Sequence, residues 1–321
     1  MPPPIHTLAI VLTERCNARC AHCAYWQDRA GTAEIEDFSP FYRAIEDAAR
    51  LSPGVVITLT GGEPFLCPEL FPLIRHAKAR PAGKVVVPTN GLALPDDRVA
   101  ELCRTGLDEI VLSLDGFEAT HDRLRGVPGA FGRVRRLIER IHAEPRRPET
   151  LVLATISAAN LDEFRDFALF LRDDRRIARV VLQAITQPMP APADPAWHAR
   201  HALWPRDGAK IDALFGWLIA RRDDLRLHNG AAQLATMKRY FREPDRLVWK
   251  SCNVGTRYLC VLPDGHVLNC ILRGPIGNVR RDRLDAIVAS AETAAQVREM
   301  EACRLNCHFL VNCGFLEGEL A

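Results

Sequence analysis

The stretch that decides the fold is residues 7–26, TLAIVLTERCNARCAHCAYW. It begins with a short apolar run, Thr7–Leu12, of the continuous kind that is typical of a buried parallel strand. Three cysteines follow, Cys16, Cys20 and Cys23, with three residues between the first pair and two between the second. Three thiolates on one loop can bind three irons of a cubane cluster and leave the fourth iron open to a substrate or cofactor.

Two simpler interpretations of these cysteines are less favoured. A zinc site usually has four ligands in more even pairs, and only His22 is available nearby as a fourth ligand. A disulfide framework needs an oxidising compartment, and the N-terminus has no character of a signal peptide. The chain has 11 cysteines, which in the absence of an export signal indicate metal or redox chemistry in a reducing compartment. We therefore expect a cytoplasmic protein.

Composition excludes several other classes. The 321 residues are 48% hydrophobic, enough for one large core, or for one large and one small core. The formal net charge is +2, so no nucleic-acid or membrane partner is expected. No apolar stretch reaches the length needed to cross a bilayer.

Apolar, β-branched runs alternate with helical patterns through the first part of the chain, and this alternation predicts a parallel sheet covered by helices. The expected strands are Thr7–Leu12, Val55–Thr60, Lys84–Pro88, Glu109–Leu114, Thr150–Ile156 and Arg179–Ala184. The expected helices lie at about Pro40–Ala49, Cys67–Ala79, Asp96–Arg104, Phe131–His142 and Asn160–Arg172. Six strands are too few for a full eight-fold barrel, so the fold class is α/β with a partial, open barrel.

The strands then stop, and the composition divides the chain into three parts. We predict a barrel over residues 1–187 and a bridging segment over 188–250, with helices at Gly208–Arg222 and Ala231–Phe241. Residues 251–321 form a small cysteine-dense α+β domain, too small to be stable on apolar burial alone. Two apolar runs around Pro263-Asp264-Gly265 predict a β-hairpin within it.

Polar motifs follow three of the strands, at the edge where a barrel of this type has its active site. Gly61 and Gly62 let the backbone approach a ligand, and Glu63 can receive an ammonium group. Ser113 can hold a ribose hydroxyl or a carboxylate, and Arg125 can hold a carboxylate through a bidentate pair. The alternatives are an ordinary strand-to-helix turn for the glycines, and helix caps or loop bridges for Ser113 and Arg125.

The ordered set C-x3-C-x2-C, G-G-E-P, T-N-G, S-L-D-G and H-D-x-x-R-G resembles the radical S-adenosylmethionine superfamily, in the branch with a C-terminal SPASM or twitch domain. The resemblance implies a partial (β/α)6 barrel and a [4Fe–4S] cluster on Cys16, Cys20 and Cys23. It further implies S-adenosylmethionine on the open iron, cleaved reductively to methionine and a 5′-deoxyadenosyl radical, with reduced flavodoxin or ferredoxin as electron donor. One departure is His22, where the family often has an aromatic residue.

The C-terminal cysteines fit the same resemblance. Cys252 is followed by 12 residues, Gly265, four residues and Cys270, which resembles the opening of such a domain. The remaining predicted ligands are Cys303, Cys307 and Cys313. The last two cysteines of a complete SPASM motif are absent, which favours one auxiliary [4Fe–4S] cluster over two. Its expected ligands are Cys252, Cys270, Cys303 and one of the two cysteines that follow. For this fourth ligand, Cys307 is preferred to Cys313. A zinc site on the same cysteines is the main alternative.

Cys260 is left over from this set. A two-residue turn in the hairpin would place it on the face away from Cys270, whereas a three-residue turn would reverse that argument. Its possible roles are a further cluster ligand, a catalytic thiol that returns a hydrogen atom to a substrate radical, or a small buried packing residue.

Three functions are therefore open: a radical oxidase or cross-linking enzyme, a radical epimerase that uses Cys260, and a non-catalytic iron–sulfur protein. The intact cofactor-binding set argues against the third. The resemblance implies that the substrate is a peptide or a small natural product such as a sugar or aminocyclitol. The first strand begins close to Met1, which leaves no room for an N-terminal leader-binding domain and weakens the peptide alternative. In the bridging segment, a pocket or plain packing is expected for Trp197, His198, His201 and Trp204.

Overall fold

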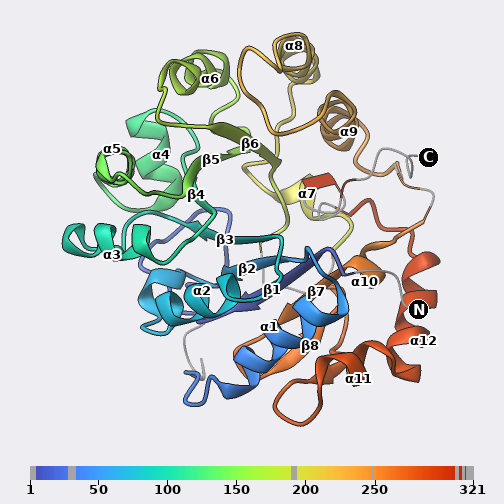
Figure 1. Ribbon diagram of the computed structural model, residues 1–321. Coiled ribbons are helices and arrows are strands. Elements are labelled where there is room, and N and C mark those ends of the chain that lie inside the picture. Colours follow the sequence, from blue (N-terminus) through green and yellow to red (C-terminus); the bar gives the residue numbers. More distant parts are fainter. Residues whose placement is uncertain are drawn as a thin grey trace.

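The computed structural model describes residues 5–27, 34–188, 194–246, 249, 251–307, 311–312 and 315. Its centre is one curved sheet of nine strands in the order β6-β5-β4-β3-β2-β1-β7-β8-β9, with helices around its outer side (Figure 1). Neighbouring strands from β1 to β6 are parallel. This arrangement is the predicted partial (β/α)6 barrel, followed in the chain by the cysteine-rich segment.

The strands are β1 (Thr7–Val11), β2 (Val56–Thr60), β3 (Lys84–Thr89), β4 (Glu109–Ser113), β5 (Glu149–Ile156), β6 (Arg179–Ala184), β7 (Tyr258–Val261), β8 (His266–Leu268) and β9 (Gly277–Asn278). The helices of the barrel are α1 (Ser39–Leu51), α2 (Leu70–Lys78), α3 (Val99–Arg104), α4 (Glu118–Arg125), α5 (Ala130–Ala143) and α6 (Phe164–Asp173), with short 3-10 turns η1 (Pro64–Leu66) and η2 (Asp96–Arg98). The later helices are α7 (Trp197–Arg200), α8 (Gly208–Ala220), α9 (Ala231–Arg242), α10 (Val254–Arg257), α11 (Leu284–Val288) and α12 (Ala291–Glu301).

Alternate residues of each barrel strand point to opposite faces of the sheet. In β1, Leu8 and Ile10 belong to the large core that the outer helices cover, whereas Ala9 and Val11 lie on the other face in a small cluster with Cys260. The inner face of the barrel is therefore lined by the second set of residues. Ser113 shares this face, because its neighbours Leu112 and Leu114 are in the outer core.

The hairpin of the cysteine-rich segment continues the barrel sheet. β7 pairs in parallel with β1, with Cys260 opposite Ala9, and β8 and β9 follow as antiparallel strands. The connection from Leu262 to His266 has three residues, because Leu262 N–H donates to the His266 carbonyl at 2.8 Å and Cys260 lies opposite Leu268. The two-residue turn considered from the sequence is therefore wrong.

The bridging segment covers the far edge of the sheet. Helices α8 and α9 pack against each other beyond β6 (Figure 1). Leu227 forms an isolated parallel bridge with Val180, and the Asn229 side chain bonds the Leu182 N–H and carbonyl at 2.7 and 3.1 Å. These bonds satisfy an edge that would otherwise present unpaired backbone groups.

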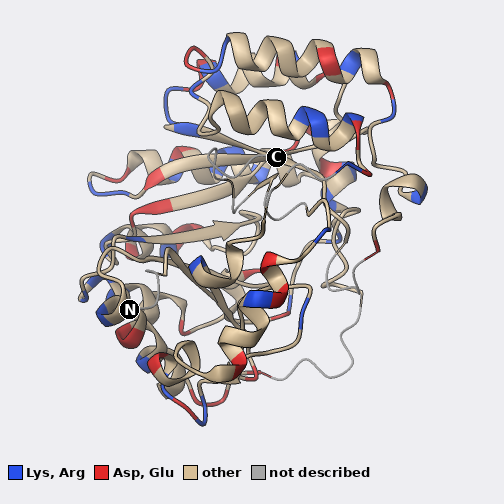
Figure 2. Cartoon of the chain, turned by 90° about the vertical axis from the view of Figure 1, so that its right-hand side faces the viewer, with Lys and Arg blue, Asp and Glu red and all other residues tan. Residues whose placement is uncertain are grey.

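Positively and negatively charged residues are interspersed along the chain (Figure 2), which has 42 Lys and Arg residues and 40 Asp and Glu residues. None of the described helices is long and apolar enough to cross a lipid bilayer.

Candidate active site

The loop that carries Cys16 is held against the turn after β2. Gly62 N–H donates to the Thr13 carbonyl at 2.7 Å, and Glu63 N–H donates to the Arg15 carbonyl at 2.8 Å. A Cβ at Gly61 would lie 2.4 Å from the Thr13 oxygen, and a Cβ at Gly62 would lie 2.3 Å from the Arg15 oxygen. Both glycines are therefore needed for close approach of the cysteine loop itself, and Gly61 also has a φ of +150°.

A second support comes from the C-terminal end of α4. The carbonyls of Leu124 and Arg125 accept bonds from Ala21 N–H at 2.8 Å and Arg19 N–H at 2.9 Å. Gly126 ends α4 in the left-handed region with a φ of 64°, and a Cβ there would lie 2.6 Å from the Arg19 oxygen. The H-D-x-x-R-G motif is thus a helix end that is built to receive the cysteine loop.

Two of the motif cysteines accept hydrogen bonds from buried side chains. Asn90 Nδ2 lies 3.7 Å from Cys16 Sγ, and Arg125 Nη1 lies 3.8 Å from Cys20 Sγ. Hydrogen bonds to cluster sulfurs are one of the means by which a protein sets the reduction potential of an iron–sulfur cluster. The bond from Arg125 to Cys20 is buried, whereas the bond from Asn90 to Cys16 is only partly buried, because Cys16 itself is partly exposed.

Arg125 is itself held by Asp115, which is completely buried. The guanidinium Nε and Nη2 lie 2.8 and 2.7 Å from Asp115 Oδ2, and Thr155 N–H donates to Oδ1 at 3.0 Å. Burial alone would raise the pKa of Asp115, but the nearby Arg125, His22 and His121 outweigh it and hold the pKa below its ordinary value. The pair therefore keeps the arginine rigid beside Cys20.

Glu63 is also completely buried. Its carboxylate accepts bonds from Asn90 N–H at 2.8 Å, Thr89 hydroxyl at 2.8 Å and Phe65 N–H at 3.1 Å. Burial raises its pKa to about 6, although these donors work against that shift. Glu63 thus joins the ends of β2 and β3 under the cysteine loop, with one of a carboxylate's roughly four acceptor positions unused.

The structure gathers the predicted cofactor-binding residues at one edge of the sheet, the carboxyl ends of β1 to β4. Gly61, Gly62 and Glu63 follow β2, Ser113 ends β4, and Arg125 ends α4. Contacts of these residues with S-adenosylmethionine stay predictions, because their observed partners belong to the chain itself. His22 lies near Arg125, Asp115 and His201, and burial, followed by the charge of Arg125, lowers its pKa to about 4.

Four of the predicted auxiliary ligands line one cavity of about 220 Å³. They are Cys252, Cys270, Cys303 and Cys307, and the other lining residues are Trp249, Ser251, Leu272, Arg273, Met300 and Leu305. None of the 10 described cysteines forms a disulfide. The donor set fits a [4Fe–4S] cluster, which takes four thiolates in an otherwise largely apolar setting. Cys313 lies outside the described residues.

Among the described residues, no three cysteine, histidine or carboxylate side chains converge as ligands of a single metal ion. A cubane cluster does not require such convergence, because each thiolate binds a different iron.

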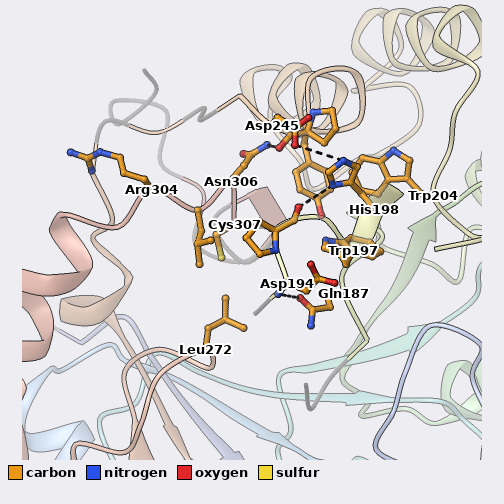
Figure 3. Close-up of a pocket in the computed structure, with 14 residues that line it drawn as sticks. Gln187, Asp194, Trp197, His198, Trp204, Asp245, Leu272, Arg304, Asn306 and Cys307 are labelled. Carbon is orange, nitrogen blue, oxygen red and sulfur yellow. Dashed lines mark hydrogen bonds and ion pairs between the residues drawn. The ribbon is translucent and has the colours of Figure 1, made fainter. Parts of the chain in front are cut away.

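A second cavity, of about 210 Å³, is drawn in Figure 3. It shares the lining residues Leu272, Leu305 and Cys307 with the four-cysteine cavity. Its wall includes Gln187, which follows β6 at the mouth of the barrel, and Cys307, which also lines the four-cysteine cavity. From the bridging segment it receives Trp197, His198 and Trp204, three of the four residues for which a pocket or packing was expected. His201 is not among the lining residues, although it lies near His22. We call this space the mouth cavity.

Cys260 lies apart from the four-cysteine cavity. It is 5% exposed and packs with Ala9 and Val11 on the inner face of the barrel. Burial raises the pKa of its thiol to about 11, so the thiol is protonated at neutral pH. Cys260 also lies near Tyr25 of the cysteine loop, close enough for a thiolate charge to act on the Tyr25 hydroxyl.

Comparison with known proteins identifies the class. Residues 10–171 match the radical SAM superfamily, and residues 252–308 match an iron–sulfur cluster-binding domain of the SPASM type. The chain belongs to the radical SAM superfamily and carries a C-terminal SPASM domain. Its cofactors are accordingly a [4Fe–4S] cluster, S-adenosylmethionine and an auxiliary cluster.

Individual relatives are more distant. The AdoMet-dependent heme synthase of Methanosarcina barkeri is 34% identical over 49% of this chain and 44% of its own length. The GTP 3′,8-cyclase of Parasynechococcus marenigrum is 36% identical over 40% of this chain and 39% of its own length. These matches thus span less than half of either relative. Among solved structures, anSMEcpe with bound AdoMet and the Cp18Cys peptide has a TM-score of 0.70 at 16% identity, over 99% of this chain and 89% of that one.

Sequence reasoning missed three parts of this site. Asn90 stood in a noted motif without a role, and Asp115 was noted only as part of S-L-D-G, although it positions Arg125. Trp249 was not singled out at all, yet it lines the four-cysteine cavity. Two of them had a signal in the sequence: Asn90 is a polar residue directly after β3, and Trp249 is an aromatic residue three positions before Cys252.

Proposed function

We propose that this enzyme oxidises or cross-links a peptide or small natural-product substrate held in the mouth cavity. When bound, the cofactors supply the radical chemistry: reductive cleavage of S-adenosylmethionine gives a 5′-deoxyadenosyl radical that abstracts a substrate hydrogen atom, and the auxiliary cluster provides an electron acceptor. The ligands of that acceptor would be Cys252, Cys270, Cys303 and Cys307.

One observation carries this proposal: Cys307 lines both the mouth cavity and the four-cysteine cavity. A substrate in the mouth cavity would lie between Gln187, at the barrel mouth, and a ligand of the auxiliary cluster. Such a position suits a reaction in which the substrate loses a hydrogen atom on one side, an electron to the auxiliary cluster on the other, and a proton to water, so that the product has lost two hydrogens in all. The aromatic rings of Trp197, Trp204 and Tyr240 would supply apolar contacts, and Asp194 and Asp245 polar ones.

Solved structures of the same fold support a peptide as the substrate class. Two solved relatives of this fold were obtained with peptides: anSMEcpe with the Cp18Cys peptide and Streptococcus suis SuiB with its precursor peptide SuiA. The curated relatives are named as heme synthases and GTP cyclases, which share no substrate class. A peptide is therefore the first class to test. Reduced flavodoxin or ferredoxin is the expected electron donor.

The test uses the anaerobically reconstituted protein with S-adenosylmethionine, a chemical reductant and panels of short peptides and amino sugars. The expected result is 5′-deoxyadenosine formation that depends on one substrate, together with a product that has lost two hydrogens. Cys307→Ala is expected to keep 5′-deoxyadenosine formation and lose the oxidised product. An oxidised product formed equally well by Cys307→Ala would contradict the proposed role of the auxiliary site.

A second function is favoured by the position of Cys260. A thiol that returns a hydrogen atom must be protonated and close to the reacting centre, and Cys260 has a raised pKa and lies on the inner face of the barrel. In that case the product has unchanged mass and inverted configuration. Cys260→Ala would then abolish epimerisation and leave 5′-deoxyadenosine formation, whereas an oxidase would be little affected.

A further inference from the structure

Trp249 carries a buried hydrogen-bond donor with no partner in the described part of the chain. Its side chain is 1% exposed, and its indole Nε1 is among the buried polar atoms without a bond. More than about nine in ten buried polar groups in native proteins are paired. Leaving such a donor unpaired costs the hydration of its N–H group with no hydrogen bond in return. An orphaned indole N–H in a well-packed position therefore indicates an acceptor that the described residues do not supply.

The surroundings of the ring show where that acceptor lies. Trp249 lines the four-cysteine cavity, while Phe315 packs edge-on against the ring at a centroid distance of 5.7 Å. Three further lining residues, Leu272, Met300 and Leu305, are apolar. The side-chain acceptors of this cavity are thus the four cysteine sulfurs, whatever those sulfurs bind, and the Ser251 hydroxyl; Arg273, the other polar lining residue, only donates.

A second orphaned donor belongs to the residue that follows Cys252 in the chain. The Nδ2 atom of Asn253 is also buried without a partner among the described residues. Asn253 does not itself line the cavity, but an unsatisfied donor next to a lining cysteine agrees with a group rich in acceptors on these thiols. A [4Fe–4S] cluster has this property, because its sulfides and thiolates carry negative charge and accept N–H bonds.

We propose that Trp249 donates a hydrogen bond from Nε1 to a sulfur of the auxiliary cluster and thereby raises its reduction potential. The inference rests on the proposed assignment of Cys252, Cys270, Cys303 and Cys307 as the cluster ligands. A hydrogen bond to sulfur stabilises the reduced cluster more than the oxidised one, because the reduced cluster carries one more negative charge. Trp249 would thus make the auxiliary cluster a better electron acceptor for the substrate radical.

The test isolates the auxiliary cluster in a variant with Cys16, Cys20 and Cys23 replaced by alanine, and adds Trp249→Phe, which keeps an aromatic ring and removes the N–H. Iron and sulfide are counted first, and the midpoint potential is then measured by an electron paramagnetic resonance titration. Trp249→Phe is expected to keep about four irons and to shift the potential to a more negative value. Trp204→Phe, in the mouth cavity, is the matched control and is expected to leave the potential unchanged.

A second measurement leaves Trp249 in place, in case the phenylalanine variant folds poorly. The triple alanine variant is labelled with ¹⁵N in its indoles, and the reduced cluster is examined for a hyperfine coupling to ¹⁵N. A coupling is expected, because Trp249 is the tryptophan that lines this cavity. An iron-loaded sample with an unshifted potential and no coupling would overturn the inference and leave the auxiliary cluster standing. A sample that holds zinc in place of iron would overturn both.

Discussion

Replacing Gly62 by alanine should loosen the cysteine loop from the barrel. The new Cβ would lie 2.3 Å from the Arg15 carbonyl oxygen and 2.7 Å from that of Glu14, whereas real Cβ atoms essentially never approach closer than 3.0 Å. Both neighbours are backbone atoms, so no flexible side chain can give way. The loop must therefore move by about 0.7 Å or more, the gap between 2.3 and 3.0 Å.

The energetic cost follows from what that movement breaks. The bonds from Gly62 N–H to Thr13 at 2.7 Å and from Glu63 N–H to Arg15 at 2.8 Å are both at risk. Each is worth about 1 kcal/mol net, and overpacking adds about 1–3 kcal/mol. We expect Gly62→Ala to lose about 3–5 kcal/mol of unfolding free energy, which corresponds to a fall in Tm on the order of 10 °C.

The assay is thermal unfolding of the cluster-free protein, together with the iron content after reconstitution. Gly216→Ala is the matched control: Gly216 lies within α8, a Cβ there meets nothing within 4 Å, and alanine in a helix is expected to stabilise by about 0.5–1 kcal/mol. If Gly62→Ala unfolds at the wild-type temperature and holds the wild-type amount of iron, the close approach of the two loops stabilises neither the fold nor the cysteine site.

Three further changes probe the same edge of the barrel. Asp115→Asn leaves the buried Arg125 without its counter-charge and should cost about 3–5 kcal/mol in urea unfolding; a cost below about 1 kcal/mol would contradict the pairing. Arg15 lines an open hollow beside Cys16, so Arg15→Glu should slow reduction by an acidic flavodoxin about tenfold and leave chemical reduction unchanged; equal slowing of both would refute a docking role. Burial raises the pKa of Glu63 to about 6 from 4.5, so the charged carboxylate is disfavoured in the folded state. The free energy of unfolding of the wild type should therefore fall by about 2 kcal/mol relative to that of Glu63→Gln as the pH rises from below 4.5 to above 6. A stability difference between these two proteins that does not change with pH would count against that reasoning.

The barrel strands were predictable because they are apolar on both faces. The strand expected at Arg179–Ala184 has these bounds in the structure, and that expected at Glu109–Leu114 ends one residue earlier. Helix α4 was not predicted, because residues 118–125 are mostly polar and offer little apolar periodicity. The sequence left open whether Arg125 binds a ligand, caps a helix or bridges loops, and in the structure the backbone carbonyls at this helix end support the cysteine loop.

Non-local pairings could not be predicted from the chain. Nothing in residues 258–261 shows that this strand pairs with β1, some 250 residues away, so the hairpin was expected within a separate domain. The position of Cys260 depended on the length of one turn, and the structure has the three-residue alternative. Cys260 nevertheless lies apart from the four-cysteine cavity, because β8 ends at Leu268 before Cys270 is reached.

Motif spacing alone predicted that four C-terminal cysteines form one site. In the structure these cysteines line one cavity: Cys252, Cys270, Cys303 and Cys307. The partners of Arg125 did not follow in the same way. The arginine was expected to hold a ligand carboxylate, and in the structure its guanidinium already holds Asp115 and Cys20. A buried ion pair between residues ten apart on different elements has no local sequence signal.

The central claim is that one radical cluster and one auxiliary cluster occupy the two cysteine sets. The most direct measurement is iron and sulfide content after anaerobic reconstitution, for the wild type, for the variant lacking Cys16, Cys20 and Cys23, and for Cys307→Ala. We predict about eight irons in the wild type and about four in the triple variant, with Cys307→Ala losing auxiliary iron. About four irons in the wild type falling to none, with zinc retained on the C-terminal cysteines, would contradict the account.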